Sequence, residues 1–160
     1  MDRLKELFEE LGFDDVRTFI ASGNVIFRTK SSKPEALTKK IETLLNQSLG
    51  YEVPTILRTV AELNAIVSVE PFAQDIASDS DDLYVILLAR SATPEAVGLL
   101  NALRTDDDEF FVDNKEVYWL RRKPVSESRI PVKAFNKALT QPGTSRNMTT
   151  LRKLKADLDS

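Results

Sequence analysis

The chain has 160 residues, of which 42% are apolar and 29% charged, with a net charge of −3, as in a soluble globular protein of one domain or two small subdomains. It contains neither cysteine nor histidine, which excludes disulfides, zinc sites built on these residues, thiol nucleophiles and Ser-His-Asp catalysis. Its apolar runs are too short for a membrane span, and its charged beginning is not a secretory signal. We therefore expect a cytoplasmic protein without metal or cofactor, and we favour a binding role over an enzymatic one.

The chain begins with an amphipathic helix and a β-hairpin. Apolar residues recur at helical spacing over residues 2–11, and Gly12 follows where helices commonly end. Two strand-forming runs, 16–20 and 25–29, flank the small polar cluster 21–24 and predict a hairpin.

A helix, a strand and a second helix follow the hairpin. Pro34 and Gly50 bound an apolar stripe of helical spacing. Residues 53–58 predict a short strand, and Thr59 with Glu62 matches a capping box at the start of a further helix.

Residues 71–82 lose this periodicity and become acidic, so we expect a linker between a first half, 1–70, and a second half, 83–160. The second half begins with an apolar run that predicts a buried central strand. The expected elements are a strand over 83–89, a helix over 93–103, a hairpin of 110–112 with 117–120, and helices over 131–140 and 149–158.

Both halves approximate a β-α-β-β-α-β order with an added helix, provided that a strand precedes the first helix. We therefore predict an α+β protein of two ferredoxin-like (split βαβ) subdomains, the first lacking its initial strand. That strand is central in this arrangement, so its loss leaves unpaired backbone groups. A misplaced start, a strand supplied by a partner chain or re-paired strands would each account for this, and we favour the first.

Several segments resemble an uncharacterised bacterial family, domain of unknown function 1697. They are LFEELGFDDVRTFIASGNVIF at 7–27, VPTILRTVAEL at 53–63 and TSRNMTTLRKL at 144–154. The resemblance covers essentially the whole chain and implies paired ferredoxin-like subdomains, with no established activity. Family members typically open with a strand and a segment Arg-Gly-Ile-Asn-Val-Gly-Gly, which these 160 residues do not contain.

Charge is distributed unevenly along the second half. Residues 70–119 carry twelve acidic and three basic side chains, a net of −9, whereas residues 120–160 carry three acidic and ten basic ones, a net of +7. Such asymmetry is typical of an anion or nucleic-acid site, and equally of two segments that neutralise each other.

Two short segments are candidates for binding an anionic ligand. The hairpin turn offers small polar groups, although a turn alone explains them. The segment before the last helix offers free N–H groups and a guanidinium, although Asn147 or Thr149 could simply cap that helix. The candidate residues are Ser22, Gly23, Asn24, Thr144, Ser145, Arg146, Asn147 and Lys153.

Other polar and aromatic clusters carry weaker signals. Residues 106–109 are acidic but lack calcium-loop spacing, so we expect a solvated turn. Phe111, Tyr118 and Trp119 lie on predicted strands, where core packing is favoured over base stacking, and alternation places Tyr118 and Trp119 on opposite faces.

Three functions follow, in order of preference. The first is binding of an anionic ligand, either nucleic acid or a phosphate-bearing metabolite, near Arg146, Asn147 and the basic stretch 121–137. The second is protein–protein assembly through an open sheet edge, including formation of a homo-oligomer. The third is an enzyme acting on a small phosphorylated substrate through Ser22, Asn24 or Arg146.

Overall fold

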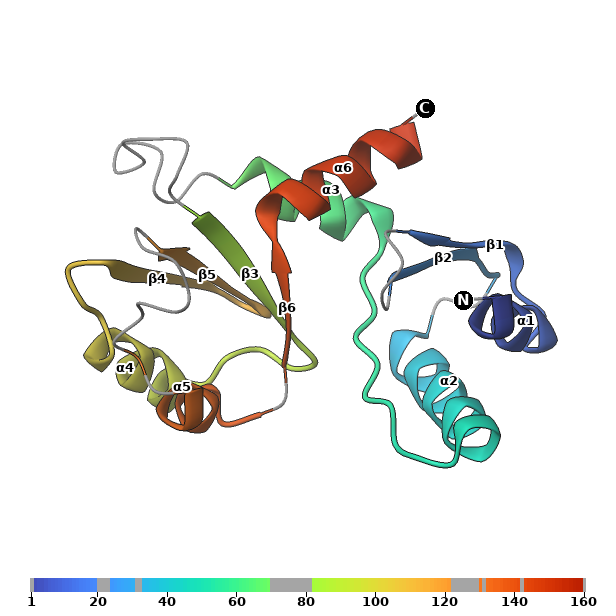
Figure 1. Cartoon of the computed structure of the whole chain (residues 1–160), viewed down its shortest axis with the longest axis horizontal. Coiled ribbons are helices and arrows are strands. Elements are labelled where there is room, and N and C mark those ends of the chain that lie inside the picture. Colours follow the sequence, from blue (N-terminus) through green and yellow to red (C-terminus); the bar gives the residue numbers. More distant parts are fainter. Residues whose placement is uncertain are drawn as a thin grey trace. The chain divides into compact units, whose positions relative to one another are not determined.

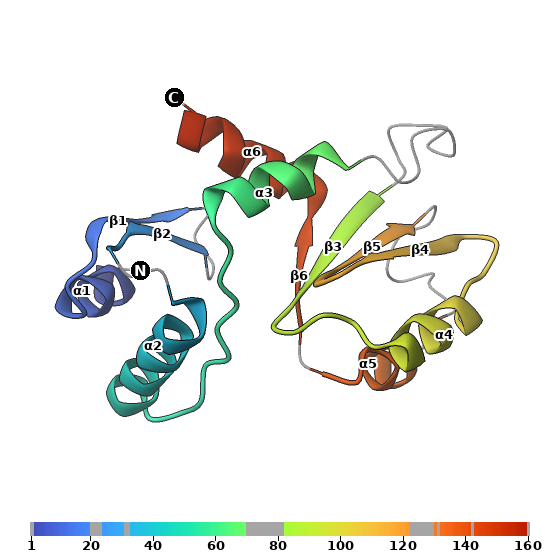
Figure 2. The same cartoon turned by 180° about the vertical axis from the view of Figure 1, so that it is seen from behind.

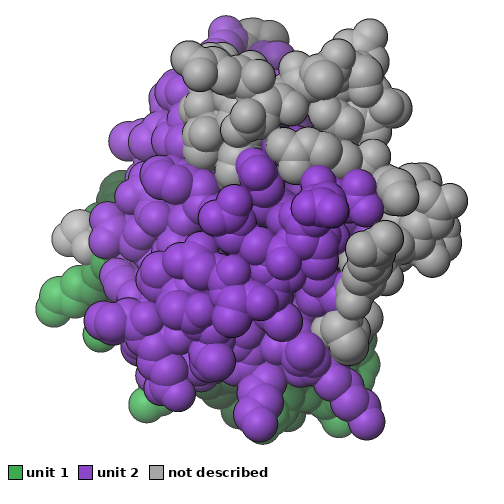
Figure 3. Space-filling view, turned by 90° about the vertical axis from the view of Figure 1, so that its left-hand side faces the viewer, with its two compact units in different colours: residues 1–57 green, residues 58–160 purple. Residues whose placement is uncertain are grey.

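The computed structural model has an α+β fold, as the sequence predicts. Within the residues that it describes there are six helices and two antiparallel sheets (Figure 1). The chain divides into two compact units, unit 1 with residues 1–57 and unit 2 with residues 58–160, coloured separately in Figure 3. No helix in the described ranges combines the length and apolar character that crossing a membrane requires. The described residues are 2–19, 24–30, 33–69, 82–121, 130, 132–141 and 143–159.

Unit 1 contains the predicted helix, hairpin and helix. Both helices end at a glycine with a left-handed backbone, Gly12 at φ 86° and Gly50 at φ 81°, a conformation that costs glycine little. The predicted helices and strands are thereby confirmed, whereas the turn residues 20–23 lie outside the described residues. The elements are α1 (Asp2–Glu10), β1 (Asp14–Phe19), β2 (Asn24–Arg28) and α2 (Pro34–Leu49).

The core of unit 1 forms between the two helices and one strand. Its buried side chains come from α1, from the start of β1 and from α2. Phe13 stacks on Phe27 of β2 with ring centroids 4.3 Å apart. The buried members are Leu7, Phe8, Phe13, Val16, Ile41 and Leu45.

The strand predicted over residues 53–58 is not formed. The unit 1 sheet consists of β1 and β2, and residues 52–59 have no assigned helix or strand. Figure 1 draws this segment as a stretched trace from the end of α2 toward α3. A strand requires a neighbouring strand for its backbone groups, and the described part of unit 1 provides none for these residues.

Unit 2 contains one four-stranded antiparallel sheet, in the order β4-β5-β3-β6. The elements from β3 to β6 follow the order β-α-β-β-α-β, with β3 and β5 in the centre, which is the split β-α-β order. The elements are α3 (Val60–Ser68), β3 (Asp82–Leu88), α4 (Pro94–Ala102), β4 (Asp108–Asp113), β5 (Glu116–Arg121), α5 (Val132–Leu139), β6 (Gly143–Asn147) and α6 (Met148–Asp159).

Side-chain alternation along β3 and β5 divides the unit 2 core into two layers. Ile86 and Val117 pack with α4 and α5 on one face, whereas Val85 and Tyr118 pack with α3 and α6 on the other. Figure 2 shows α3 and α6 side by side over the sheet. Helices thus cover both faces of the central strands.

Helix α3 belongs to unit 2, whereas the sequence-based boundary placed it in the first half. Its buried residues Leu63 and Ile66 pack with β3, β5 and α6, which leaves them no role in the unit 1 core. The division between the compact units therefore falls after residue 57. Residues 71–81 of the predicted linker lie outside the described residues, and residue 82 already begins β3.

Residues 143–147 form the edge strand β6, although no element is expected there from the sequence. Gly143 pairs with Leu88 and Asn147 with Tyr84 of β3. A side chain at Gly143 would come within 2.9 Å of Ile86 Cγ2, so only glycine fits there without a shift. The open edge of the apolar strand β3 gives this polar segment its partner, which local propensity cannot reveal.

Candidate functional site

The predicted hairpin-turn site is described only at its last residue. Ser22 and Gly23 lie outside the described residues. Asn24 begins β2, pairs with Phe19 and donates its side-chain amide to the Phe19 carbonyl at 3.3 Å. The Asn24 amide therefore closes the hairpin.

The second predicted site is built from strand β6 and the start of α6. Asn147 Oδ1 accepts a hydrogen bond from the Thr149 N–H at 2.8 Å and thus caps α6, which was the structural alternative for this segment. Arg146 Nη1 donates to Thr144 Oγ1 and to the Ser145 carbonyl, both at 2.9 Å. The polar groups of this segment are therefore hydrogen-bonded to one another.

The predicted residues do not all come from one unit. Asn24 belongs to unit 1, whereas Thr144, Ser145, Arg146, Asn147 and Lys153 belong to unit 2. Within unit 2, a hydrogen bond joins Thr144 and Arg146, and Lys153 is an exposed residue of α6.

A comparison of the two units identifies a different candidate site. In unit 2, β3 is followed along the chain by α4, β4, β5, α5 and β6, and it pairs with both β5 and β6. In unit 1 the order α1-β1-β2-α2 is the same, and residues 53–57 follow where β6 would be. Among the described residues, unit 1 has no counterpart of β3, so neither β2 nor residues 53–57 have the neighbour that this arrangement supplies in unit 2.

The burial of the equivalent strands differs accordingly. Three residues of β5, Val117, Tyr118 and Leu120, have no exposed area, because β3 lies beside them. Every residue of β2 is half-buried or exposed, although Val25 and Phe27 contact the unit 1 core. Val53 and Leu57 likewise remain half-buried at the edge of that core. The candidate site is this pair of edges, defined as β2 together with residues 53–57.

Side chains occupy backbone groups of residues 53–57 that a neighbouring strand would bind. Glu42 of α2 accepts the Thr55 N–H through Oε2 at 3.0 Å. Thr55 Oγ1 donates to the Val53 carbonyl at 3.2 Å. Such local bonds satisfy backbone groups of a segment that lies outside the sheet, and a strand can replace them.

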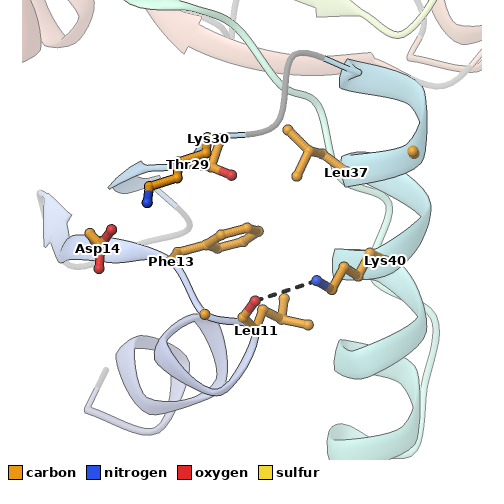
Figure 4. Close-up of a pocket in the computed structure, with 9 residues that line it drawn as sticks. Leu11, Phe13, Asp14, Thr29, Lys30, Leu37 and Lys40 are labelled. Atoms are coloured by element: carbon orange, nitrogen blue, oxygen red, sulfur yellow. Dashed lines mark hydrogen bonds between the residues drawn. The ribbon is translucent and has the colours of Figure 1, made fainter.

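Two hollows lie on the surface of unit 1. One, of about 370 Å³, opens between the end of α1 and the first turns of α2, with Phe13 and Leu37 in its wall (Figure 4). Lys40 Nζ at its mouth donates to the Leu11 carbonyl at 3.4 Å. The other, of about 530 Å³, lies between α2 and residues 52–54, with Glu42 in its wall. None of the predicted site residues lines either hollow.

Unit 2 contains a buried ion pair that the sequence does not signal. Arg58 Nη2 donates to Glu116 Oε2 at 2.9 Å, to the Leu88 carbonyl at 2.8 Å and to the Lys115 carbonyl at 3.1 Å. Only 9% of the Arg58 side chain and 16% of the Glu116 side chain are exposed. Burial raises the pKa of Glu116, and the charge of Arg58 offsets part of this rise. The pair fixes the beginning of unit 2 to the β4–β5 turn.

The aromatic residues of β4 and β5 are divided between the two faces of the sheet. Tyr118 and Trp119 belong to opposite layers, as alternation predicts. Tyr118 is fully buried, and burial together with the charges of Glu116 and Asp113 raises the pKa of its hydroxyl. Phe111 remains 42% exposed, so the expectation of core packing is wrong for this residue.

The acidic stretch 106–109 is not simply a solvated turn. Asp108 begins β4 and is only 2% exposed. It accepts the Trp119 indole N–H through Oδ1 at 2.9 Å and the Thr105 hydroxyl through Oδ2 at 2.8 Å. No group of three or more acidic side chains in the described residues is arranged to hold a metal ion.

The family model described as Protein of unknown function (DUF1697) matches residues 1–118. The chain belongs to this family. No protein among the curated ones matches it. A solved structure, the conserved bacterial protein SP0830 from Streptococcus pneumoniae, is similar with a TM-score of 0.73 and 20% sequence identity, over 100% of this chain and 89% of that one. The similarity supports the fold, and the family carries no specific function.

Proposed function

We propose that unit 1 is an assembly module, which binds an extended strand of another polypeptide between β2 and residues 53–57. The observation that carries the proposal is the contrast between the two units. In unit 2, β3 lies between the equivalent elements and buries β5. In unit 1, β2 has no fully buried residue, and its sheet has two strands within the described residues. An unpaired sheet edge is a template for strand addition.

The chemistry of the bound strand follows from β3. Five of its seven residues, DLYVILL, are aliphatic and are distributed over both faces, because helices cover both faces of the sheet. In unit 1, the apolar edge of the core is formed by Val25, Phe27, Val53 and Leu57. The partner strand should therefore carry aliphatic residues toward this core and run antiparallel to β2, as β3 runs to β5.

A labelled peptide tests this proposal. It carries the sequence of Asp82–Leu88 between solubilising lysines, and its binding to the full chain is followed by fluorescence anisotropy. A fusion protein fills the site with a strand of its own. It carries a second copy of residues 82–93 directly before Asp2, so that the added strand and loop lead into α1 as β3 leads into α4. In the matched control, Val85→Asp and Leu87→Asp are introduced into the added copy alone.

We expect saturable binding to the chain and to the control fusion, and loss of binding to the fusion whose site is filled. Equal binding to all three proteins, or to none, would contradict the proposal. Light scattering on the chain alone identifies the source of the strand. If the chain forms an oligomer and the filled fusion does not, the strand comes from a second copy of the chain. If the chain is a monomer, the strand comes from an unlike partner.

A further inference from the structure

A buried arginine in unit 2 has hydrogen-bonding capacity that the described structure does not use. Arg121 is the last residue of β5 and only 4% of it is exposed. Its Nε and Nη2 atoms are buried and, within the part of the chain that the structure describes, have no hydrogen-bond partner. A guanidinium is always charged, and a buried charge is normally paired.

The two unpaired atoms form one edge of the guanidinium. Nε–H and Nη2–H point the same way in the plane of the group, which is the geometry that matches two oxygens of a carboxylate or a phosphate. The two parallel donors of a single edge can both bind one ligand. The free edge therefore selects an oxyanion.

Aromatic rings hold the Arg121 side chain in place. Its Cζ lies 4.7 Å from the centroid of Trp119 and 5.7 Å from that of Tyr84. Contacts of this kind favour the cation and fix the plane of the guanidinium, which lowers the entropic cost of binding a ligand. They satisfy none of its N–H groups.

An acidic residue opposite Arg121 in the sheet is already engaged in hydrogen bonds. Asp108 lies opposite Arg121 in the register of β4 and β5 and is buried on the same face of the sheet. Its two oxygens accept the Trp119 indole N–H and the Thr105 hydroxyl. No ion pair between Asp108 and Arg121 occurs in the described structure. Asp82 of β3 also lies opposite Arg121, and its side chain is outside the description.

We propose that the Nε–Nη2 edge of Arg121 binds the oxyanion group, carboxylate or phosphate, of a ligand of unit 2. The site does not depend on strand binding by unit 1, because all its residues belong to unit 2. The two N–H groups of this edge match the two oxygens of a single carboxylate or phosphate group.

Trp119, the only tryptophan of the chain, gives a direct signal because Arg121 lies against its ring. The full chain is titrated with inorganic phosphate and, separately, with acetate, and the tryptophan emission is measured against sodium chloride of equal ionic strength. The two arms distinguish a phosphate from a carboxylate ligand. Thermal unfolding in the same solutions gives a second readout, since a ligand of the folded state raises the melting temperature.

We expect at least one oxyanion to change the emission saturably and to raise the melting temperature of the wild type. Arg121→Lys keeps the charge and loses the fork, so its apparent Kd should rise on the order of tenfold. Arg104→Lys, at a side chain that is 56% exposed in the same unit, should leave the Kd unchanged. Arg121→Met should abolish the response while folding at least as well without the anion, because it removes an unpaired buried charge.

Three results would overturn the proposal. One is that neither phosphate nor acetate changes the tryptophan emission or the melting temperature more than sodium chloride does. The second is an equal response of the wild type and Arg121→Lys. The third is a loss of stability in both Arg121→Met and Asp82→Asn, because the arginine would then have an internal counter-ion in place of a ligand.

Discussion

Replacement of Arg58 by methionine should destabilise unit 2 strongly. Arg58 makes two hydrogen bonds with Glu116, at 3.2 and 2.9 Å, and one each with the Leu88 and Lys115 carbonyls. Methionine fills similar space without charge, so Glu116 would stay buried with no counter-ion. Removing one partner of a buried pair costs about 3–5 kcal/mol. The Lys115 carbonyl keeps the Leu88 N–H at 2.8 Å, which places the expected loss near the lower end, about 3 kcal/mol.

Urea unfolding followed by Trp119 emission measures this loss, because the only tryptophan lies in β5 of unit 2. Arg104→Met is the matched control. Its guanidinium lies 3.8 Å from Glu109 with 56% of the side chain exposed, so its loss should be about 0–1 kcal/mol. If Arg58→Met cost no more than Arg104→Met, the buried pair would have no part in the stability of unit 2.

Four further substitutions test other parts of unit 2. Asn147→Ala removes the cap of α6 and should cost about 0.5–2 kcal/mol in urea unfolding, whereas no change would mean that the 2.8 Å bond to Thr149 N–H is unimportant. Gly143→Ala places a methyl group 2.9 Å from Ile86 Cγ2 and 3.2 Å from the Leu87 carbonyl, and should cost about 1–3 kcal/mol. Gly98→Ala adds a Cβ that meets nothing within 4 Å in α4, so it should instead stabilise the chain by about 0.5–1 kcal/mol. If both glycine substitutions changed the free energy of unfolding in the same direction, this packing would be contradicted. Because the pKa of Glu116 is raised above its ordinary value of 4.5, its neutral form is favoured in the folded state, and stability is lost as pH rises through the folded-state pKa. Between about pH 4 and about pH 6.5, the free energy of unfolding of the wild type should therefore fall relative to that of Glu116→Gln. A constant difference between the two proteins over this range would refute this.

Local sequence signals predict the helices and the hairpins well. Thr59 and Glu62 form the capping box that their spacing indicates, with both reciprocal hydrogen bonds present. Gly12 and Gly50 have the left-handed backbone expected at helix ends. These features depend on neighbours within a few residues, so the sequence contains what determines them.

Features that depend on distant partners were not predictable in the same way. Residues 53–58 have strand-forming side chains yet no strand beside them, whereas the polar residues 143–147 form a strand because β3 offers an edge. Arg58 and Asp108 resemble ordinary surface charges in the sequence and are buried by contacts with β5. Among the candidate site residues, Asn147 was one of two predicted helix caps, with Thr149, and the structure assigns the cap to Asn147. The roles of Arg58 and Arg121 follow only from tertiary packing.

Amide hydrogen exchange of β2 and residues 53–57 tests the central proposal, that these two edges of unit 1 bind a strand of another polypeptide. Exchange is measured on the full chain alone and with the peptide that carries the sequence of Asp82–Leu88. The β2 amides that do not pair with β1 should exchange much faster than those of β5 and become protected when the peptide binds. If the β2 amides are as protected as those of β5 in the chain alone, or unchanged by the bound peptide, unit 1 has no open site for a strand.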